Sequence, residues 1–201
     1  RAIVSMDNSE MQIKVSEFKK LNNPKAYLHE FLKDYGFTEW NDVVNLLDAQ
    51  SGKQLFSSKY RLLKDRDVLI LKEIYSNEPD AIISISEVDS EVELPLGMLI
   101  LSDVSHIEKT NSKVIHVDKE TLKFPLTLRK WNQGDYFYPL GMQGKKKLSK
   151  YFKDEKLSLI EKENIWLLCS SEDVVWVIGM RTDRRFKVRA STRNILKIEL
   201  V

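Results

Sequence analysis

The sequence has few of the residues that build disulfide frameworks or metal sites. Its 201 residues include one cysteine and three histidines. The single Cys169 excludes an internal disulfide and a cysteine-rich zinc site. It lies in the apolar run 165–169, where we expect a buried, unreactive thiol. The histidines are far apart and share no metal-ligand spacing, so the sequence predicts no metal site.

The sequence also lacks any long hydrophobic run. No apolar stretch approaches the ~18 residues that cross a bilayer, and the start shows no signal-peptide pattern. The longest apolar stretches, near 99–101 and 174–178, are typical of strands. We therefore expect a cytoplasmic protein without a membrane partner. The first residue is Arg1 rather than Met, which fits a piece of a longer chain.

Motifs of the common enzyme classes are missing as well. The sequence contains no Gly-x-Ser-x-Gly, His-Glu-x-x-His or Gly-x-Gly-x-x-Gly pattern. The glycine-rich segment 141–147 is not a Walker motif. It lacks the four-residue gap between glycines and the Ser or Thr that would hold Mg²⁺. The sequence therefore predicts no catalytic residue, no metal and no cofactor within this chain.

Charge is unevenly distributed along the chain. Residues 1–115 carry 14 Lys or Arg against 19 Asp or Glu, whereas residues 116–201 carry 18 against 11. Such asymmetry indicates a polyanion-binding module joined to a neutral or acidic one.

The apolar spacing predicts an α+β fold. A helix is expected after the cap Asn23 and Pro24, with apolar residues at helical spacing from Tyr27 to Tyr35 and a stop at Gly36. Beyond Gly52 the apolar period shortens to that of strands. We predict a mainly helical N-terminal domain with a small β portion, then a small α+β domain with a mostly antiparallel sheet. The predicted bounds are 1–75 for the first domain, 76–117 for a β-containing connection and 118–201 for the second domain.

The sharpest feature is a basic stretch that follows two glycines, Gly141 and Gly144. Three lysines are expected in the first turn of a helix, where the dipole favours negative charge, so an external anion is their natural partner. The alternative is a solvated lysine face that serves solubility. The candidate phosphate-binding cations of this stretch are Arg129, Lys130, Lys145, Lys146, Lys147 and Lys150.

A second basic group follows the predicted strand 174–180. Its arginines, Arg181, Arg184 and Arg185, have planar guanidinium groups that suit bidentate phosphate contacts. The alternative is that they form local salt bridges with Asp183. Aromatic residues between the basic groups, such as Tyr136 and Tyr138, could stack on bases.

The last third of the chain resembles the C-terminal domain of bacterial tRNA(Ile)-lysidine synthetases. The resemblance rests on Leu128-Arg129, Gly134-Asp135, Pro139-Leu140-Gly141-Met142, Gly144, Lys146-Lys147-Leu148, Phe152, Trp176-Val177-Ile178-Gly179, Asp183 and Arg185-Phe186-Lys187. Upstream, Tyr35-Gly36-Phe37, Ser51-Gly52-Lys53, Arg61-Leu62, Asp65-Arg66-Asp67 and Leu69-Ile70 look like the middle, tRNA-binding domain of that family. The match covers most of the chain.

The resemblance implies a tRNA-modifying ligase. Such enzymes use ATP, with Mg, to activate the wobble cytidine of an isoleucine tRNA with a CAU anticodon, and lysine then attacks to form lysidine. The chemistry belongs to an N-terminal domain with a Ser-Gly-Gly-x-Asp-Ser loop, which this sequence lacks. We therefore expect a C-terminal portion that binds and positions the tRNA, with the cations named above as contacts.

The resemblance also assigns supporting roles. Gly141 and Gly144 would shape the lysine loop and Asp135 would brace it. Tyr136 stands where the family often has Arg, and Trp166 where a Pro is common. The sequence is also compatible with a homodimer. The alternative function is a non-catalytic regulatory or protein-interaction module with a solvated basic face.

Overall fold

The computed structural model describes residues 3–7, 10–74 and 82–201. The chain divides into two compact units, Arg1–Glu78 and Pro79–Val201, and each is described by itself. Among the described residues, no helix is both long enough and apolar enough to span a membrane.

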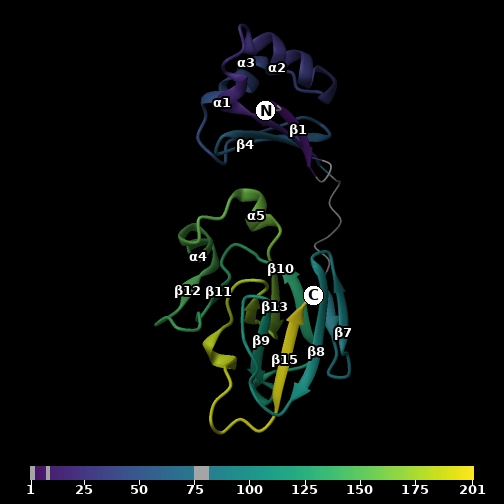
Figure 1. The fold of residues 1–201 in the computed structure, drawn as a ribbon, viewed down its shortest axis with the longest axis vertical. Coiled ribbons are helices and arrows are strands. Elements are labelled where there is room, and N and C mark those ends of the chain that lie inside the picture. Colours follow the sequence, from purple (N-terminus) through teal and green to yellow (C-terminus); the bar gives the residue numbers. More distant parts are fainter. Residues whose placement is uncertain (1–2, 8–9, 75–81) are drawn as a thin grey trace. The chain divides into compact units, whose positions relative to one another are not determined.

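The first unit packs short helices on one face of a five-stranded antiparallel sheet with the order β1-β2-β5-β4-β3 (Figure 1). Residues from both layers, such as Phe18, Leu28 and Leu69, share one buried core. The elements are β1 (Val4–Asp7), β2 (Glu10–Lys14), α1 (Val15–Phe18), α2 (Pro24–Leu32), η1 (Lys33–Tyr35), α3 (Trp40–Asn45), η2 (Leu46–Asp48), β3 (Gln54–Phe56), β4 (Tyr60–Asp65) and β5 (Val68–Glu73).

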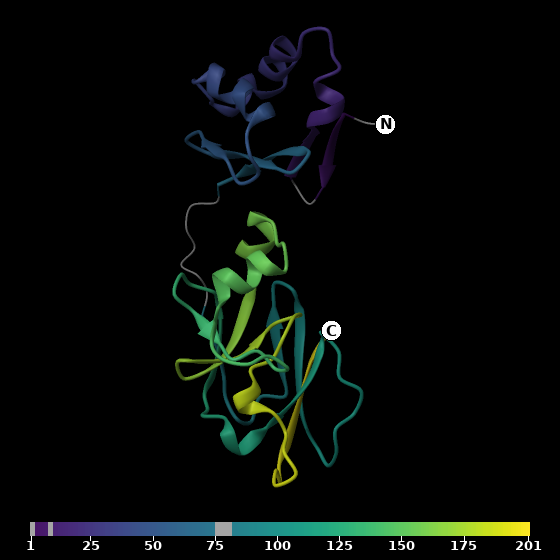
Figure 2. The same ribbon diagram turned by 90° about the vertical axis from the view of Figure 1, so that its left-hand side faces the viewer.

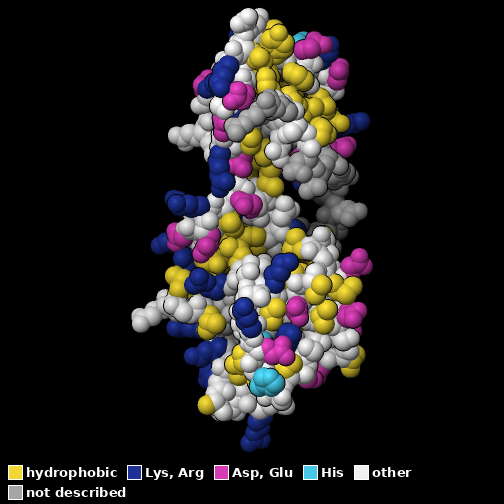
Figure 3. Space-filling view, viewed as in Figure 1, with side chains coloured by type: hydrophobic (Ala, Val, Ile, Leu, Met, Phe, Trp, Pro, Cys, Tyr) yellow, Lys and Arg dark blue, Asp and Glu magenta, His cyan; other side chains and the backbone are white. Residues whose placement is uncertain are grey.

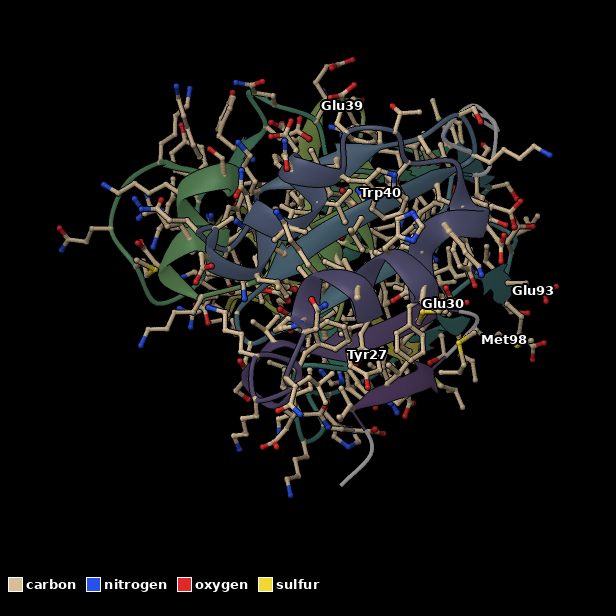
Figure 4. All side chains as sticks on the ribbon, turned by 90° about the horizontal axis from the view of Figure 1, so that it is seen from above. Tyr27, Glu30, Glu39, Trp40, Glu93 and Met98 are labelled. Atoms are coloured by element: carbon tan, nitrogen blue, oxygen red, sulfur yellow. The ribbon has the colours of Figure 1, made fainter. Side chains whose placement is uncertain are left out.

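The predicted start of α2 is confirmed, whereas α2 ends at Leu32 and the predicted stop Gly36 ends the 3-10 turn η1 that follows. The Asn23 side chain accepts a hydrogen bond from the Ala26 amide at 3.2 Å, and Gly36 after η1 adopts φ +76°. The apolar residues predicted for this helix do not all face the core. Leu28 is fully buried, whereas Tyr27 is 49% exposed and is labelled on the outer side of α2 in Figure 4.

The α+β class is confirmed, and the β part of the first unit is larger than expected. Strands β1 and β2 precede the helices, and β2 joins the sheet by pairing Met11 with Leu71 and Ile13 with Leu69. Such pairing links segments that are distant in sequence, which apolar periodicity alone does not reveal.

The second unit contains two four-stranded antiparallel sheets, with the orders β7-β8-β15-β9 and β14-β13-β10-β6 (Figures 1 and 2). A two-stranded hairpin, β11-β12, and two short helices accompany them. The elements are β6 (Ile83–Ile85), β7 (Glu91–Leu94), β8 (Gly97–Val104), β9 (Val114–Asp118), η3 (Lys119–Thr121), β10 (Leu126–Lys130), β11 (Tyr136–Phe137), β12 (Lys146–Lys147), α4 (Leu148–Asp154), α5 (Leu159–Glu163), β13 (Trp166–Ser170), β14 (Asp173–Val177), η4 (Arg184–Phe186) and β15 (Ile195–Leu200).

Strand β13 is buried on both faces because it lies between two cores. Leu168 belongs to the core between the two four-stranded sheets. Its neighbours Leu167 and Cys169 face the opposite way, into a core with Leu148 and Phe152 of α4. Cys169 is fully buried, and burial raises the pKa of its thiol to about 11. The predicted burial of Cys169 is therefore confirmed, and a raised thiol pKa favours an unreactive thiol.

The domain bounds differ from the predicted ones. The stretch predicted as a connection, 76–117, supplies β6, β7, β8 and most of β9. β6 pairs with β10, and β8 and β9 both pair with β15. These strands are therefore part of the second unit, because β6, β8 and β9 pair with strands from residues 126–200 and β7 pairs with β8. Residues 75–81 lie outside the described part of the chain.

Candidate nucleic-acid interface

The predicted position of the three lysines in a first helical turn is wrong. Lys146 and Lys147 form strand β12, where Lys147 pairs with Tyr136 and Lys146 with Phe137. Helix α4 begins only at Leu148. The fully buried Phe137 anchors this hairpin to the core of α4. Lys147 is the N-cap residue of α4, and Lys145 and Lys146 precede it, so none of the three lysines lies inside the first helical turn.

Arg129 braces the turn that leads into the hairpin. Its guanidinium group donates to both carboxylate oxygens of Asp135, at 2.8 and 2.9 Å, and to the Lys130 carbonyl oxygen. Burial alone would raise the pKa of Asp135, but hydrogen bonds from Arg129 and the Asn132 amide lower it. The Arg129 side chain is 19% exposed. Its charge is thus neutralised inside the protein, and the Asp135 side chain braces the turn 132–135. A role of Asp135 in the lysine loop stays a prediction.

Arg185 is neutralised in the same way. Its Nε and Nη2 donate to the two carboxylate oxygens of Asp183, at 3.0 and 2.8 Å, and its Nη1 donates to Asp173 at 2.6 Å. The Asp183 side chain is fully buried. The hydrogen bonds that Arg185 donates to Asp183 and Asp173 outweigh partial burial and raise the pKa of Arg185. Arg185 therefore forms the local salt bridges that the sequence analysis gave as the alternative to phosphate binding.

Asp183 also joins the two basic segments. Its Oδ2 accepts a hydrogen bond from the Tyr138 amide at 2.8 Å. The Arg184 amide donates to the Tyr138 carbonyl at 2.8 Å, and the Leu140 amide donates to the Thr182 carbonyl at 2.9 Å. The loop 138–145 therefore lies directly against the segment 181–185. Two groups that are about 40 residues apart in sequence become neighbours.

The cations left exposed at this junction form what we call the basic surface: Lys145, Lys147, Lys150 and Arg184. In Figure 3, Lys and Arg side chains gather along the left-hand edge of the second unit, over the region of β11, β12 and α4. Lys147 and Lys150 form no ion pair with the part of the chain that the structure describes. Their charges are available to an external anion.

Aromatic rings position two of these cations. The Lys145 ammonium lies 3.5 Å from the ring centroid of Tyr136, which is 36% exposed. The Arg184 guanidinium lies 5.5 Å from the Tyr138 ring. Such cation–π contacts hold the charge in place and leave its outer side open to a partner. Tyr136 stands at a position where the resembling sequences often have Arg. Its ring holds the Lys145 ammonium in place.

Three predicted cations are less available. The Lys146 ammonium pairs with Asp154 at 2.9 Å and is 16% exposed. Lys130 is half-buried, with its ammonium 5.0 Å from the ring of Trp166. Arg181 is half-buried and lies near Tyr151, where it opposes the rise in the pKa of the phenol that burial causes.

A hollow of about 410 Å³ opens beside the hairpin, between the loop 139–147 and α4; we call it the lysine hollow. Pro139 and Met142 supply apolar walls, and Lys145, Lys147 and Lys150 supply cations. The loop curves through Gly141 and Gly144, whose φ values are +83° and +80°. A side chain at either position would be strained by this backbone conformation rather than by lack of space.

The sequence did not predict that Asp183 joins the two basic segments. The sequence predicts Asp183 only as a local partner of the arginines, whereas Asp183 also accepts a hydrogen bond from a backbone amide 45 residues away. The sequence did contain one signal for this role: a carboxylate that lies between a predicted buried strand and several arginines is expected to be hydrogen-bonded. Among the described residues, no group of three or more His, Cys, Asp or Glu could hold a metal ion.

Comparison with known proteins supports the division into two domains. Residues 6–74 match the TilS substrate binding domain, and residues 126–200 match the TilS substrate C-terminal domain. A tRNA(Ile)-lysidine synthase of Parabacteroides distasonis is 40% identical over 96% of this chain and 45% of its own length. One from Bacteroides thetaiotaomicron is 34% identical over 89% of this chain and 40% of its own length.

The fold has a counterpart among solved structures. A crystal structure of a TilS C-terminal domain superposes with a TM-score of 0.50 at 22% identity, over 60% of this chain and 98% of that chain. This likeness concerns the fold alone. The chain spans less than half the length of the two curated relatives named above. The two domain matches together show that the chain belongs to the TilS family.

Proposed function

We propose that this chain is the RNA-binding portion of a tRNA-modifying ligase and that it holds an isoleucine tRNA through the basic surface. The observation that carries the proposal is the junction at Asp183, which brings cations from two segments onto one surface. Lys147 and Lys150 have no ion pair among the described residues. Lysines and arginines exposed in this way are the usual partners of RNA phosphates.

The relatives' name supplies the proposed reaction. A tRNA(Ile)-lysidine synthase joins lysine to a cytidine of isoleucine tRNA, at the cost of ATP. We assign the binding of ATP, Mg and lysine to the part of such relatives that this chain does not match. A cytoplasmic location follows from the proposal, since tRNA is modified there in bacteria. This chain's own contribution is to bind the RNA and to orient it.

A binding titration tests the proposal. The triple variant K145A/K147A/K150A should bind an isoleucine tRNA transcript about 100-fold more weakly, on the order of 1 kcal/mol for each lost phosphate contact. The matched control is K109A/K113A/K123A, which removes three exposed lysines of the same unit that lie outside the basic surface. Its affinity should stay within about twofold of that of the wild type.

Two outcomes would overturn the proposal. One is a wild-type chain that does not bind the transcript at all. The other is an equal loss of affinity in the triple variant and in the control. Either result would favour the alternative, in which the lysines form a solvated face of a protein-interaction module. Circular dichroism of both variants checks that the fold is kept, which we expect because the substituted side chains are exposed.

A further inference from the structure

The lysine hollow has apolar walls, and contact with an RNA backbone does not require such walls. A duplex presents phosphates on a convex surface, so exposed cations alone are enough to bind it. The hollow instead places apolar walls beside its cations: Pro139 is buried, and Met142 is 37% exposed. A phosphate gains nothing from an apolar wall, whereas the flat face of a nucleobase does.

We propose that the lysine hollow takes one unpaired nucleotide of the bound RNA. The base lies against Met142 and Pro139, and the phosphate lies at Lys145, Lys147 and Lys150. This inference rests on the proposed RNA binding and names the part of the RNA that the site recognises. The volume, about 410 Å³, is near the lower end of the range of small-ligand pockets, about 300–1,000 Å³. A single nucleotide is a ligand of that size.

The charges of the hollow suit a nucleotide. Its carboxylate, Asp154, forms an ion pair with Lys146 at 2.9 Å and forms none with Lys147 or Lys150 among the described residues. That ion pair also lowers the pKa of Asp154, mainly through the hydrogen bond from Lys146. The ammonium of Lys145 is held over the Tyr136 ring. The carboxylate that lines the hollow is therefore paired with Lys146, while Lys145, Lys147 and Lys150 form no ion pair among the described residues and can meet a phosphate.

The test compares two RNA hairpins with the same duplex, one blunt and one with a single-stranded 3′ overhang of four nucleotides. Wild-type chain should bind the overhang hairpin about tenfold more tightly, because the unpaired base removes apolar surface of Met142 and Pro139 from water. The variant Met142→Ala should lose that preference, to within about twofold, while its affinity for the blunt hairpin stays unchanged. The matched control is Leu140→Ala, which removes an apolar side chain of similar exposure, 42%, that does not line the hollow.

The outcomes separate this inference from the proposed function. Equal, salt-sensitive binding of both hairpins by the wild type would overturn the nucleotide site and leave RNA binding intact. A preference that survives Met142→Ala, or that is lost equally in Leu140→Ala, would also overturn it. No binding of either hairpin would overturn the proposed function, and the nucleotide site with it. The full chain is used throughout.

Discussion

The second unit has an acidic side and a basic side, and both belong to one fold. Residues 79–115 carry two lysines and seven acidic residues, and this segment supplies β6, β7 and β8. Glu91 and Glu93 lie on the edge strand β7; Figure 4 labels Glu93. The basic surface lies on the other side of the sheets, over β12 and α4. The asymmetry along the sequence therefore separates two sides of one unit rather than two modules.

A second contrast lies within the basic side itself. Arg129 and Arg185 are neutralised by buried or half-buried carboxylates, whereas Lys147 and Lys150 are not. Cations of the first kind hold the surface in shape, and cations of the second kind are free to bind a polyanion. Counting lysines and arginines along the sequence therefore overstates the number available to RNA.

The largest effect is expected where the bracing is most deeply buried. Asp183→Asn places an amide N–H₂ against the donors of Arg185 and Tyr138, so the free energy of unfolding should fall by about 3–4 kcal/mol. The matched control is Asp173→Asn, which removes the half-exposed partner of Arg185 and should cost under about 1 kcal/mol. Urea unfolding measures both. Equal losses would contradict the view that Asp183 joins the two segments.

The Arg129–Asp135 brace should show a smaller effect that depends on pH. Asp135→Asn should lower the free energy of unfolding at pH 7 by about 2–3 kcal/mol, less than for a fully buried pair. The pKa of Asp135 is lower in the folded state than its ordinary value of 3.8. Its contribution is therefore complete well above pH 3.8 and is lost as the pH falls through 3.8 towards the folded-state pKa.

Urea unfolding from pH 7 to pH 3 tests whether the contribution of Asp135 to stability is lost as the pH falls. The difference between the wild type and Asp135→Asn should be greatest at pH 7 and should shrink towards pH 3. A difference that stays constant, or that grows at low pH, would show that Asp135 does not act as an ionised brace.

The smallest effect is expected on the acidic side. Glu91→Gln with Glu93→Gln should change the affinity for RNA less than about twofold at physiological salt, because packed sheets separate these residues from the basic surface by more than a Debye length of about 8 Å. Gel-shift titration measures it. A tenfold gain in affinity would mean that the acidic side repels the bound RNA and that the two sides do not act separately.

Features with local causes could be predicted from the sequence. The cap at Asn23, the stop at Gly36 and the buried Cys169 follow from residues next to one another. The pairing of β2 with β5 and the true extent of the second unit could not be predicted, because their hydrogen bonds join distant segments. The strand pairing of Lys146 was missed for a related reason: burial of Phe137 decides it, not the local lysine run.

The candidate site was predictable in composition but not in arrangement. The residues Lys145, Lys147 and Lys150 were named from the basic run alone. Which cations are neutralised depends on carboxylates that tertiary contacts bring in, such as Asp154 and Asp183. The lysine hollow depends on the curvature of a loop around two glycines, and a pattern of residues does not show such a shape.

The salt dependence of RNA binding tests the central claim most directly. Each neutralised phosphate contributes about −0.7 to −0.9 to the slope of log affinity against log salt. The four cations of the basic surface therefore predict a wild-type slope of about −3 to −4, less steep by about 2 to 3 in K145A/K147A/K150A. A wild-type slope near zero, or an unchanged slope in the variant, would contradict the claim that these cations hold the RNA.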